Sequence, residues 1–591
     1  MAQRMKPVDV VLIGGGLVGS VLGKELSEAG YKVVALERGR MRQTIPDFQS
    51  PAMHDELKYS VRHSLMEDVS IQTLSFRNFP HQQALPMRQL GSFLPGEGVG
   101  GAMVHWNGQT WRFQPQWFKL RSWVNEKYGK DFLSDEVWIQ DWGITYDELE
   151  PYYSWFEHIC GTAGLPYQDT GNVPGATVGD PNSGHRSKPY ANPPMKQCYS
   201  GYLFEQAAKK LGYHPFPAPS SNVTRPYKNP YGAEFKPCMY CGYCEHYGCE
   251  HFAKASPQVA ILPYALANKN FELRTESYVT KISFDKKAKV ATGVNYVDSN
   301  GREMFQPASL VVLGAFAFHN PVIMLNSGIG EPYDPKTRKG TVGRNYTYQT
   351  MSSVNIFYNG SKRINPFMGA GALGTAITDF NNGSFDHKGL GFVGGAYIAA
   401  WQTNGRPINH HPVPSGTPRW GAAWKQAVAQ HYNSTVSLSI HGSSTPHPNN
   451  YLGLDPTYRD AFGNPLGMLT FDFPYNDRLM SNYVTKKAQE IGQAMGGTHV
   501  DVSWLGDHYS IVPYQTTHNT GGAIMGTDPK TSVVNKYLQS WDLHNLWVIG
   551  ASAYPQNDGY NPTGTVGALA YWAADAIINQ YMKNPGPLVH T

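Results

Sequence analysis

The sequence is poor in charged residues and contains no long apolar run. Only 16% of its 591 residues are Asp, Glu, Lys or Arg, whereas about a quarter is usual for globular proteins. No stretch reaches the roughly 18 consecutive apolar residues that indicate a membrane-spanning helix. No cluster of Lys and Arg stands out and the formal net charge is only +4, so we expect no nucleic-acid partner.

A secretion signal is also missing from the start of the sequence. Met-Ala-Gln-Arg-Met-Lys leads into an apolar stretch, Val8 to Ile13, that is typical of a buried strand. We therefore expect no signal peptide in this chain. Taken alone, this predicts a cytoplasmic protein, unless a partner that carries a signal exports both.

Cysteine is scarce and unevenly distributed. Six cysteines in 591 residues do not form a disulfide scaffold. Cys160 and Cys198 are isolated, and we expect them to pack as small apolar residues. The remaining four, which have the spacing C-x2-C-x2-C-x4-C, are Cys238, Cys241, Cys244 and Cys249.

Three interpretations of this cysteine loop compete. The C-x2-C-x2-C spacing is typical of iron–sulfur ligands, whereas structural zinc sites more often use two separated pairs. Disulfides or free thiols are the third interpretation. An iron–sulfur cluster beside a nucleotide site would be a second redox centre. This favours a protein that transfers electrons to a further acceptor.

A nucleotide-binding βαβ unit opens the chain. The strand at 8–13 runs into Gly14-Gly15-Gly16-Leu17-Val18-Gly19, a helical pattern follows, and a second apolar strand ends at Glu37. Gly14 permits the tight turn, Gly16 lets backbone approach a pyrophosphate, and Gly19 allows the helix to pack closely on the strand. Glu37 would accept hydrogen bonds from ribose hydroxyls. The alternative is a glycine-rich turn in an ordinary α/β protein.

Several sequence segments beyond the first glycine turn resemble those of the glucose–methanol–choline (GMC) family of flavin oxidoreductases. The resemblance rests on Gly96-Glu97-Gly98-Val99-Gly100-Gly101, His518-Asn519-Thr520-Gly521-Gly522 and Asn561-Pro562-Thr563. It also covers 311–321, 327–330, 342–345 and 545–552, in the family's order and spacing. The resemblance implies FAD as cofactor. The residues that it implies for FAD binding, beyond those of the first turn, are Gly100, His105, Trp106, Asn107, Ala551 and Asn561.

The same resemblance implies the fold and its division. We expect an α/β (overall α+β) protein with a Rossmann-type FAD-binding domain, similar to that of p-hydroxybenzoate hydroxylase, and a substrate domain built on a largely antiparallel sheet. The expected FAD-binding domain is discontinuous and comprises 1–125, 200–345 and 515–591, with an iron–sulfur loop at 236–252. The expected substrate-binding domain comprises 126–199 and 346–514.

The resemblance also implies a catalytic pair. GMC enzymes remove the hydroxyl proton of an alcohol while a hydride passes from its carbon to the flavin, and histidine can take that proton near neutral pH. His518 stands at the family's histidine position, and Asn561 stands where the second residue is histidine or asparagine. Asn561 would orient the substrate oxygen. The alternative for His518 is a purely structural histidine among the 21 in the chain.

His105 carries a further hypothesis. A glycine-rich segment followed by His-Trp resembles the place where some relatives, such as pyranose oxidases, link FAD covalently through histidine. Such a bond needs a nucleophilic imidazole beside the flavin. The alternative is that His105 only packs near a non-covalently bound FAD.

Finally, the cysteine loop resembles that of membrane-bound bacterial sugar and sugar-acid dehydrogenases, in particular the gluconate dehydrogenase flavoproteins. This implies a [3Fe–4S] cluster, which needs only three of the four thiolates, and oxidation of D-gluconate to 2-keto-D-gluconate. It implies a multihaem cytochrome c subunit, with quinone as the final acceptor, and a small signal-bearing subunit that exports both chains to the periplasmic face of the inner membrane. Other substrates (2-keto-gluconate, sorbitol, fructose or glucose) and a soluble alcohol oxidase with structural zinc are the alternatives.

Overall fold

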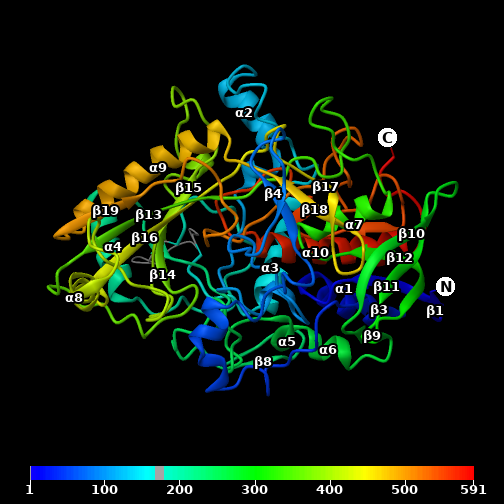
Figure 1. Ribbon diagram of the computed structural model, residues 1–591, viewed down its shortest axis with the longest axis horizontal. Coiled ribbons are helices and arrows are strands. Elements are labelled where there is room, and N and C mark those ends of the chain that lie inside the picture. The colour runs from blue at the N-terminus through cyan, green and yellow to red at the C-terminus, as the bar shows by residue number, and fades with distance from the viewer. Residues whose placement is uncertain (1, 167–178, 591) are drawn as a thin grey trace.

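The structure is a computed structural model that describes residues 2–166 and 179–590. The described residues build an eight-stranded, a six-stranded, a four-stranded and a two-stranded sheet (Figure 1). Helices lie against the two largest sheets. The two-stranded sheet pairs β7 (Tyr227–Lys228) with β8 (Glu234–Phe235).

The eight-stranded sheet has a parallel centre. Its order is β10-β11-β12-β2-β3-β9, with β1 and β20 also paired to β12. The long strand β12 pairs in parallel with β2 and β20 through its C-terminal half, and antiparallel with β11 through its N-terminal half. Its strands are β1 (Gln3–Arg4), β2 (Val8–Ile13), β3 (Val33–Leu36), β9 (Phe271–Arg274), β10 (Tyr278–Asp285), β11 (Val290–Val297), β12 (Glu303–Leu313) and β20 (Leu546–Val548).

Two helices from opposite ends of the sequence pack together beside this sheet. α1 (Leu17–Glu28) follows the first glycine turn and contacts α10 (Thr563–Ala576), which in turn packs on α3 (Tyr146–Ile159). Figure 1 shows blue α1 beside red α10 on the side of the molecule where both chain termini lie. β2 and β3 are buried along most of their length, as expected for parallel strands covered on both faces.

The six-stranded sheet is antiparallel throughout. Its order is β19-β13-β16-β15-β14-β6, and α9 (Tyr475–Ala494) packs across β13 and β16. Alternating buried positions in β13 and β16 form a separate hydrophobic core with α9. Its strands are β6 (Phe216–Pro217), β13 (Thr350–Phe357), β14 (Gly374–Ile377), β15 (Ala396–Trp401), β16 (Thr435–Gly442) and β19 (His499–Ser503).

The four-stranded sheet joins segments that are far apart in the sequence. β17 (Tyr451–Arg459) pairs with β18 (Pro465–Thr470), which lies parallel to β4 (Leu74–Arg77), and β4 pairs with β5 (Leu85–Pro86). The two-domain division at the boundaries given above stays a prediction. Strands from both expected domains meet in this sheet.

The remaining helices are short or peripheral. They are α2 (Leu120–Tyr128), α4 (Tyr199–Lys210), α5 (Pro257–Ala260), α6 (Leu262–Leu266), α7 (His319–Ser327) and α8 (Gly421–His431). Over the two described ranges, no helix combines the length and the apolar content needed to cross a membrane.

Candidate active site

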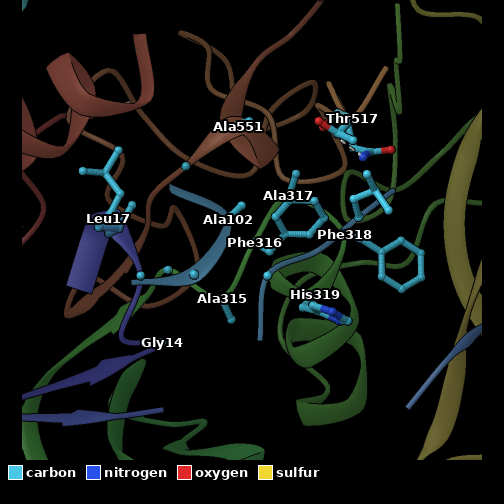
Figure 2. Close-up of a pocket in the computed structure, with 18 of the residues that line it drawn as sticks. Gly14, Leu17, Ala102, Ala315, Phe316, Ala317, Phe318, His319, Thr517 and Ala551 are labelled. Atoms are coloured by element: carbon cyan, nitrogen blue, oxygen red, sulfur yellow. Dashed lines mark hydrogen bonds between the residues drawn. The ribbon is translucent and has the colours of Figure 1, made fainter. Parts of the chain in front are cut away.

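A cleft begins where the parallel strands end. Ile13, Leu36 and Gly314, which end or follow β2, β3 and β12, all line it. Carboxyl ends of parallel strands are where open α/β sheets bind their ligands. Figure 2 shows Gly14 and Leu17 on one side of this pocket and Thr517, the residue before His518, on the opposite side.

Two positions of the first glycine turn, Gly14 and Gly19, require glycine. Gly14 has a φ of +103°, and a Cβ on Gly19 would lie 2.0 Å from the carbonyl oxygen of Gly14. Gly16 lines the cleft, and the helix α1 that follows has no side-chain cap on its first N–H groups. Uncapped N–H groups at a helix start bind anions such as a pyrophosphate.

The second glycine segment is bonded to the first. Gly100, with a φ of +91°, donates its N–H to the carbonyl oxygen of Gly15 at 2.9 Å. Neither Gly100 nor Gly19 lines the cleft, whereas Gly14 and Gly16 do. These two glycines shape the turn behind the cleft wall, and their predicted role in binding FAD stays a prediction.

Glu37 holds the glycine turn in place. Its Oε2 accepts the N–H of Gly15 at 2.7 Å and its Oε1 accepts that of Gly39 at 2.9 Å. The carboxylate also lines the cleft, where its remaining lone pairs are available. Its predicted contact with ribose hydroxyls stays a prediction.

A cation next to Glu37 was not singled out from the sequence. Arg38 lines the cleft and forms an ion pair with Glu67 at 3.1 Å, and His319 lies 3.0 Å from the same carboxylate. Burial alone would raise the pKa of Glu67, but Arg38 and His319 outweigh it and lower that pKa to about 2. Glu67 is thus ionised at neutral pH.

The predicted catalytic pair meets at the other end of the cleft. The Nε2 atom of His518 lies 2.9 Å from the Nδ2 atom of Asn561. The opposite nitrogen, Nδ1, is hydrogen bonded to Oε1 of Gln349. Both His518 and Asn561 line the cleft and are almost completely buried.

Gln349 sets the tautomer of His518. The Gln349 Nε2 donates to the carbonyl oxygens of Asp558 at 2.7 Å and Tyr560 at 2.8 Å, which fixes its Oε1 toward His518. An amide oxygen only accepts, so the Nδ1 of His518 carries the proton and Nε2 is left as the acceptor. The unprotonated Nε2 therefore faces the cleft and accepts a hydrogen bond from the NH₂ group of Asn561.

The environment keeps the His518 imidazole neutral. Burial, and then the nearby His441, lower the pKa of His518 well below its ordinary value. The two rings are 5.9 Å apart, and burial also lowers the pKa of His441 to about 4. A neutral imidazole with an unprotonated Nε2 can act as a base near neutral pH.

Aromatic rings pack beside Asn561, behind the residues that line the cleft. The Tyr397 hydroxyl lies 3.2 Å from Oδ1 of Asn561, and the Tyr397 ring stacks on Trp111 at 5.0 Å and on His441 at 5.0 Å. The same Trp111 ring also stacks on Tyr560, with the ring centres 4.8 Å apart. The contact with Tyr397 occupies the Asn561 oxygen and leaves its NH₂ group directed at His518.

His105 presents an unpartnered nitrogen within the cleft wall. Its Nε2 lies 3.1 Å from the carbonyl oxygen of Leu94, whereas its buried Nδ1 has no hydrogen-bond partner. Burial, helped by His246 and Lys254, lowers the pKa of His105 to about 3. The neighbouring Trp106 and Asn107 also line the cleft, as does Ala551.

The four clustered cysteines surround a second, smaller cavity. Cys238, Cys241, Cys244 and Cys249 all line it, and none of them forms a disulfide. Burial raises the pKa of the Cys244 thiol, so losing its proton requires a compensating cation. Across 2–166 and 179–590, no group of three or more His, Cys, Asp or Glu side chains is arranged to hold a metal ion. The metal role of the cysteines stays a proposal.

Comparison with known proteins identifies the relatives of this chain. Two sequence models of the GMC oxidoreductase family match residues 195–351 and 446–570. The "Gluconate 2-dehydrogenase flavoprotein" of Pantoea cypripedii is 47% identical over all of this chain and 96% of that protein. The "Fructose dehydrogenase large subunit" of Gluconobacter japonicus is 26% identical over 98% of this chain and 99% of its own length.

Solved structures share the fold. Pyridoxine 4-oxidase from "Mesorbium loti" matches with a TM-score of 0.59 at 18% identity over 98% of this chain and 100% of that one. A formate oxidase from Aspergillus oryzae RIB40 matches with a TM-score of 0.61 at 15% identity over the same shares. The expected fold class, a mixed α/β flavoenzyme fold, is confirmed.

Proposed function

Because the chain belongs to the GMC oxidoreductase family of FAD-dependent enzymes, we propose that it oxidises a hydroxyl group of a sugar acid, with D-gluconate converted to 2-keto-D-gluconate. The relative at 47% identity, which is named for gluconate, supports this substrate. The observation that carries the proposal is the unprotonated Nε2 of His518, 2.9 Å from the Nδ2 atom of Asn561 in the cleft.

The two side chains would share the substrate oxygen. The Nε2 of His518 accepts the hydroxyl proton, and the Nδ2 of Asn561 donates a hydrogen bond to the oxygen and orients it. FAD, when bound, supplies the acceptor for the hydride that leaves the carbinol carbon. Gln349 holds the imidazole throughout, since its amide is anchored on two backbone carbonyl oxygens.

The cleft residues fit FAD. The uncapped start of α1 and the open face at Gly16 suit the pyrophosphate, and Glu37 suits the ribose. His105 is the proposed point of covalent attachment, because its neutral, unpartnered Nδ1 is a nucleophile within the cleft wall. The further contacts proposed for FAD are those of Gly14, Trp106, Asn107, Ala551 and Asn561.

Electrons would leave through the cysteine loop. We propose that Cys238, Cys241, Cys244 and Cys249 supply the ligands of a [3Fe–4S] cluster, because all four line one cavity and are free of disulfides. The acceptor would be a multihaem cytochrome c subunit, followed by quinone.

The proposed partners also determine where the protein works. The relatives are named as a "flavoprotein" and as a "large subunit", which supports an assembly of several chains. A small signal-bearing subunit would carry this chain to the periplasmic face of the bacterial inner membrane. Co-expression with and without that subunit, followed by fractionation, tests this: periplasmic recovery without it would contradict the export route.

The cleft offers few groups for a substrate carboxylate. Among the described residues that line it, Arg38 is the only Arg or Lys, and it lies at the nucleotide end. Near His518, the wall includes His441, Glu245 and Tyr514, where the Tyr514 hydroxyl donates to Glu245. These groups suit hydroxyls well, so polyols and sugars remain the competing substrates.

A substrate screen on the purified complex tests the proposal. D-gluconate is expected to reduce the flavin faster than 2-keto-gluconate, sorbitol, fructose or glucose, with iron and labile sulfide present in the protein. Faster reduction of the flavin by a neutral sugar would contradict D-gluconate as the substrate. Zinc in place of iron would overturn the electron path and favour an oxidase.

A further inference from the structure

Lys254 joins the cysteine loop to the wall of the flavin cleft. The side chain is 1% exposed, and its Nζ donates to three backbone carbonyl oxygens. Two belong to the cysteine loop, those of Cys244 at 2.7 Å and Tyr247 at 2.8 Å, and the third belongs to Trp106 at 2.8 Å. One ammonium group thus connects the two places where redox groups are proposed.

Further hydrogen bonds strengthen the same junction. The Sγ of Cys244 lies 3.6 Å from Oδ1 of Asn222, whose Nδ2 donates to the carbonyl oxygen of Asn107 at 3.2 Å. The N–H of His246 donates to the carbonyl oxygen of His105 at 2.9 Å. Segment 105–107 lines the cleft, so a short bonded path leads from the Cys244 sulfur to the cleft wall.

The charge of Lys254 has no matching anion. Within the described ranges, no carboxylate lies at ion-pair distance from its Nζ, in contrast to Arg38, which pairs with Glu67. A buried cation is costly unless an anion or a full set of acceptors compensates it. The three carbonyl oxygens supply the acceptors. Negative charge that acts on Lys254 would come from Cys244, Cys249 and Cys241 once they are thiolates, and from the Glu245 carboxylate, which already pairs with Arg406 at 3.2 Å.

We infer that Lys254 is the counter-charge of a thiolate-bound cluster in the cysteine loop and the positioning residue that holds this loop against the flavin segment. The inference rests on the proposed cluster. A fixed positive charge beside a redox centre favours its reduced form, and hydrogen bonds and net charge are established controls of cluster potentials. Lys254 would therefore help electrons to leave the flavin for the cluster.

The experiment compares Lys254→Met with Lys254→Arg in the holoprotein. The control is Lys236→Met, which removes an exposed lysine from the cysteine loop itself. Iron and flavin contents are measured first, then the midpoint potential of the cluster by EPR-monitored titration, and then the rates of flavin reduction by D-gluconate and of ferricyanide reduction.

Lys254→Met is expected to shift the cluster potential to more negative values and to slow ferricyanide reduction about tenfold, with flavin reduction within about twofold of wild type. Lys254→Arg should keep the wild-type potential, as should the Lys236→Met control. An unchanged potential in iron-loaded Lys254→Met would overturn the inference.

Loss of iron is also decisive. If Lys254→Met fails to load iron while Lys254→Arg loads it, a positive charge is required at this position and the inference holds. If both variants fail equally, Lys254 acts through packing alone and the inference falls. Wild-type protein without iron would instead refute the proposed cluster itself, which separates the two failures.

Discussion

The Nδ2 atom of Asn561 lies 2.9 Å from the Nε2 atom of His518, so two groups proposed to bind one substrate oxygen are already hydrogen bonded to each other. A substrate hydroxyl that enters between them replaces this bond with two new ones. The geometry is maintained from behind, because Gln349 holds the other side of the His518 ring.

Replacing Gln349 tests the tautomer argument. Gln349→Met preserves the length of the side chain but removes the acceptor for the Nδ1–H of His518. Flavin reduction is expected to slow about 10- to 100-fold, the range seen when the partner that orients a functional histidine is lost, with KM changed less than kcat.

The control is Gln539→Met. Gln539 is equally buried and also donates to two carbonyl oxygens, those of His544 and Gly586, but it does not line the cleft. If both variants lose the same activity, the effect reflects general loss of a buried amide, and the tautomer role of Gln349 is rejected.

Removing the base itself should have a larger effect. His518→Ala is expected to reduce turnover by about two to four orders of magnitude while FAD stays bound, as its absorbance spectrum would show. His499→Ala, at a half-exposed histidine on β19 outside the cleft, should leave turnover unchanged. Near-normal turnover in His518→Ala would show that His518 is not the base that accepts the hydroxyl proton.

The pH dependence follows from the burial of His518. Because burial and His441 lower the pKa of His518 well below its ordinary value, the imidazole stays unprotonated throughout the neutral range. The rate of flavin reduction should therefore be flat near neutral pH and fall only as the pH drops through the lowered pKa. An acid limb centred on the ordinary histidine pKa, in stopped-flow measurements, would contradict this.

The cysteine loop should matter for electron exit but not for substrate oxidation. Cys244→Ser is expected to leave flavin reduction by substrate intact and to slow reduction of cytochrome c about tenfold or more. Cys160→Ser alters a buried cysteine outside the loop and outside both cavities, and serves as the control. Unchanged cytochrome reduction in Cys244→Ser would reject the relay role of that residue.

Covalent attachment through His105 has a direct chemical test. Acid-precipitated wild-type protein should retain its yellow colour, whereas His105→Ala should release all of its FAD into the supernatant. The control His319→Ala alters another cleft-lining histidine, which pairs with Glu67 and has no assigned attachment role. Complete release of FAD from the wild type would disprove the bond.

The sequence was most informative where function depends on neighbours along the chain. The turn at Gly14 and Gly16 and the motif that starts at His518 are local patterns, and the structure places all three residues in one cleft. Gln349 could not be predicted, because it lies 169 positions from His518 and meets it only through tertiary packing. The role of Lys254 could not be predicted for the same reason, because a single lysine does not belong to any recognisable sequence motif.

The pairing of strands that are far apart in the sequence could not be predicted either. β4 lies parallel to β18, with Leu74 opposite Gly467, although about two thirds of the chain separates the two strands. Alternating residues predict that a strand exists, but its partner depends on burial across the entire fold.

The most direct test of the central claim is anaerobic mixing of the holoprotein with D-gluconate that carries deuterium at C2. The account predicts that unlabelled D-gluconate bleaches the flavin, that the C2-deuterated compound does so distinctly more slowly, and that 2-keto-D-gluconate is the product. No bleaching by D-gluconate, or equal rates for the two compounds together with a different product, would contradict hydride transfer from C2 at this site.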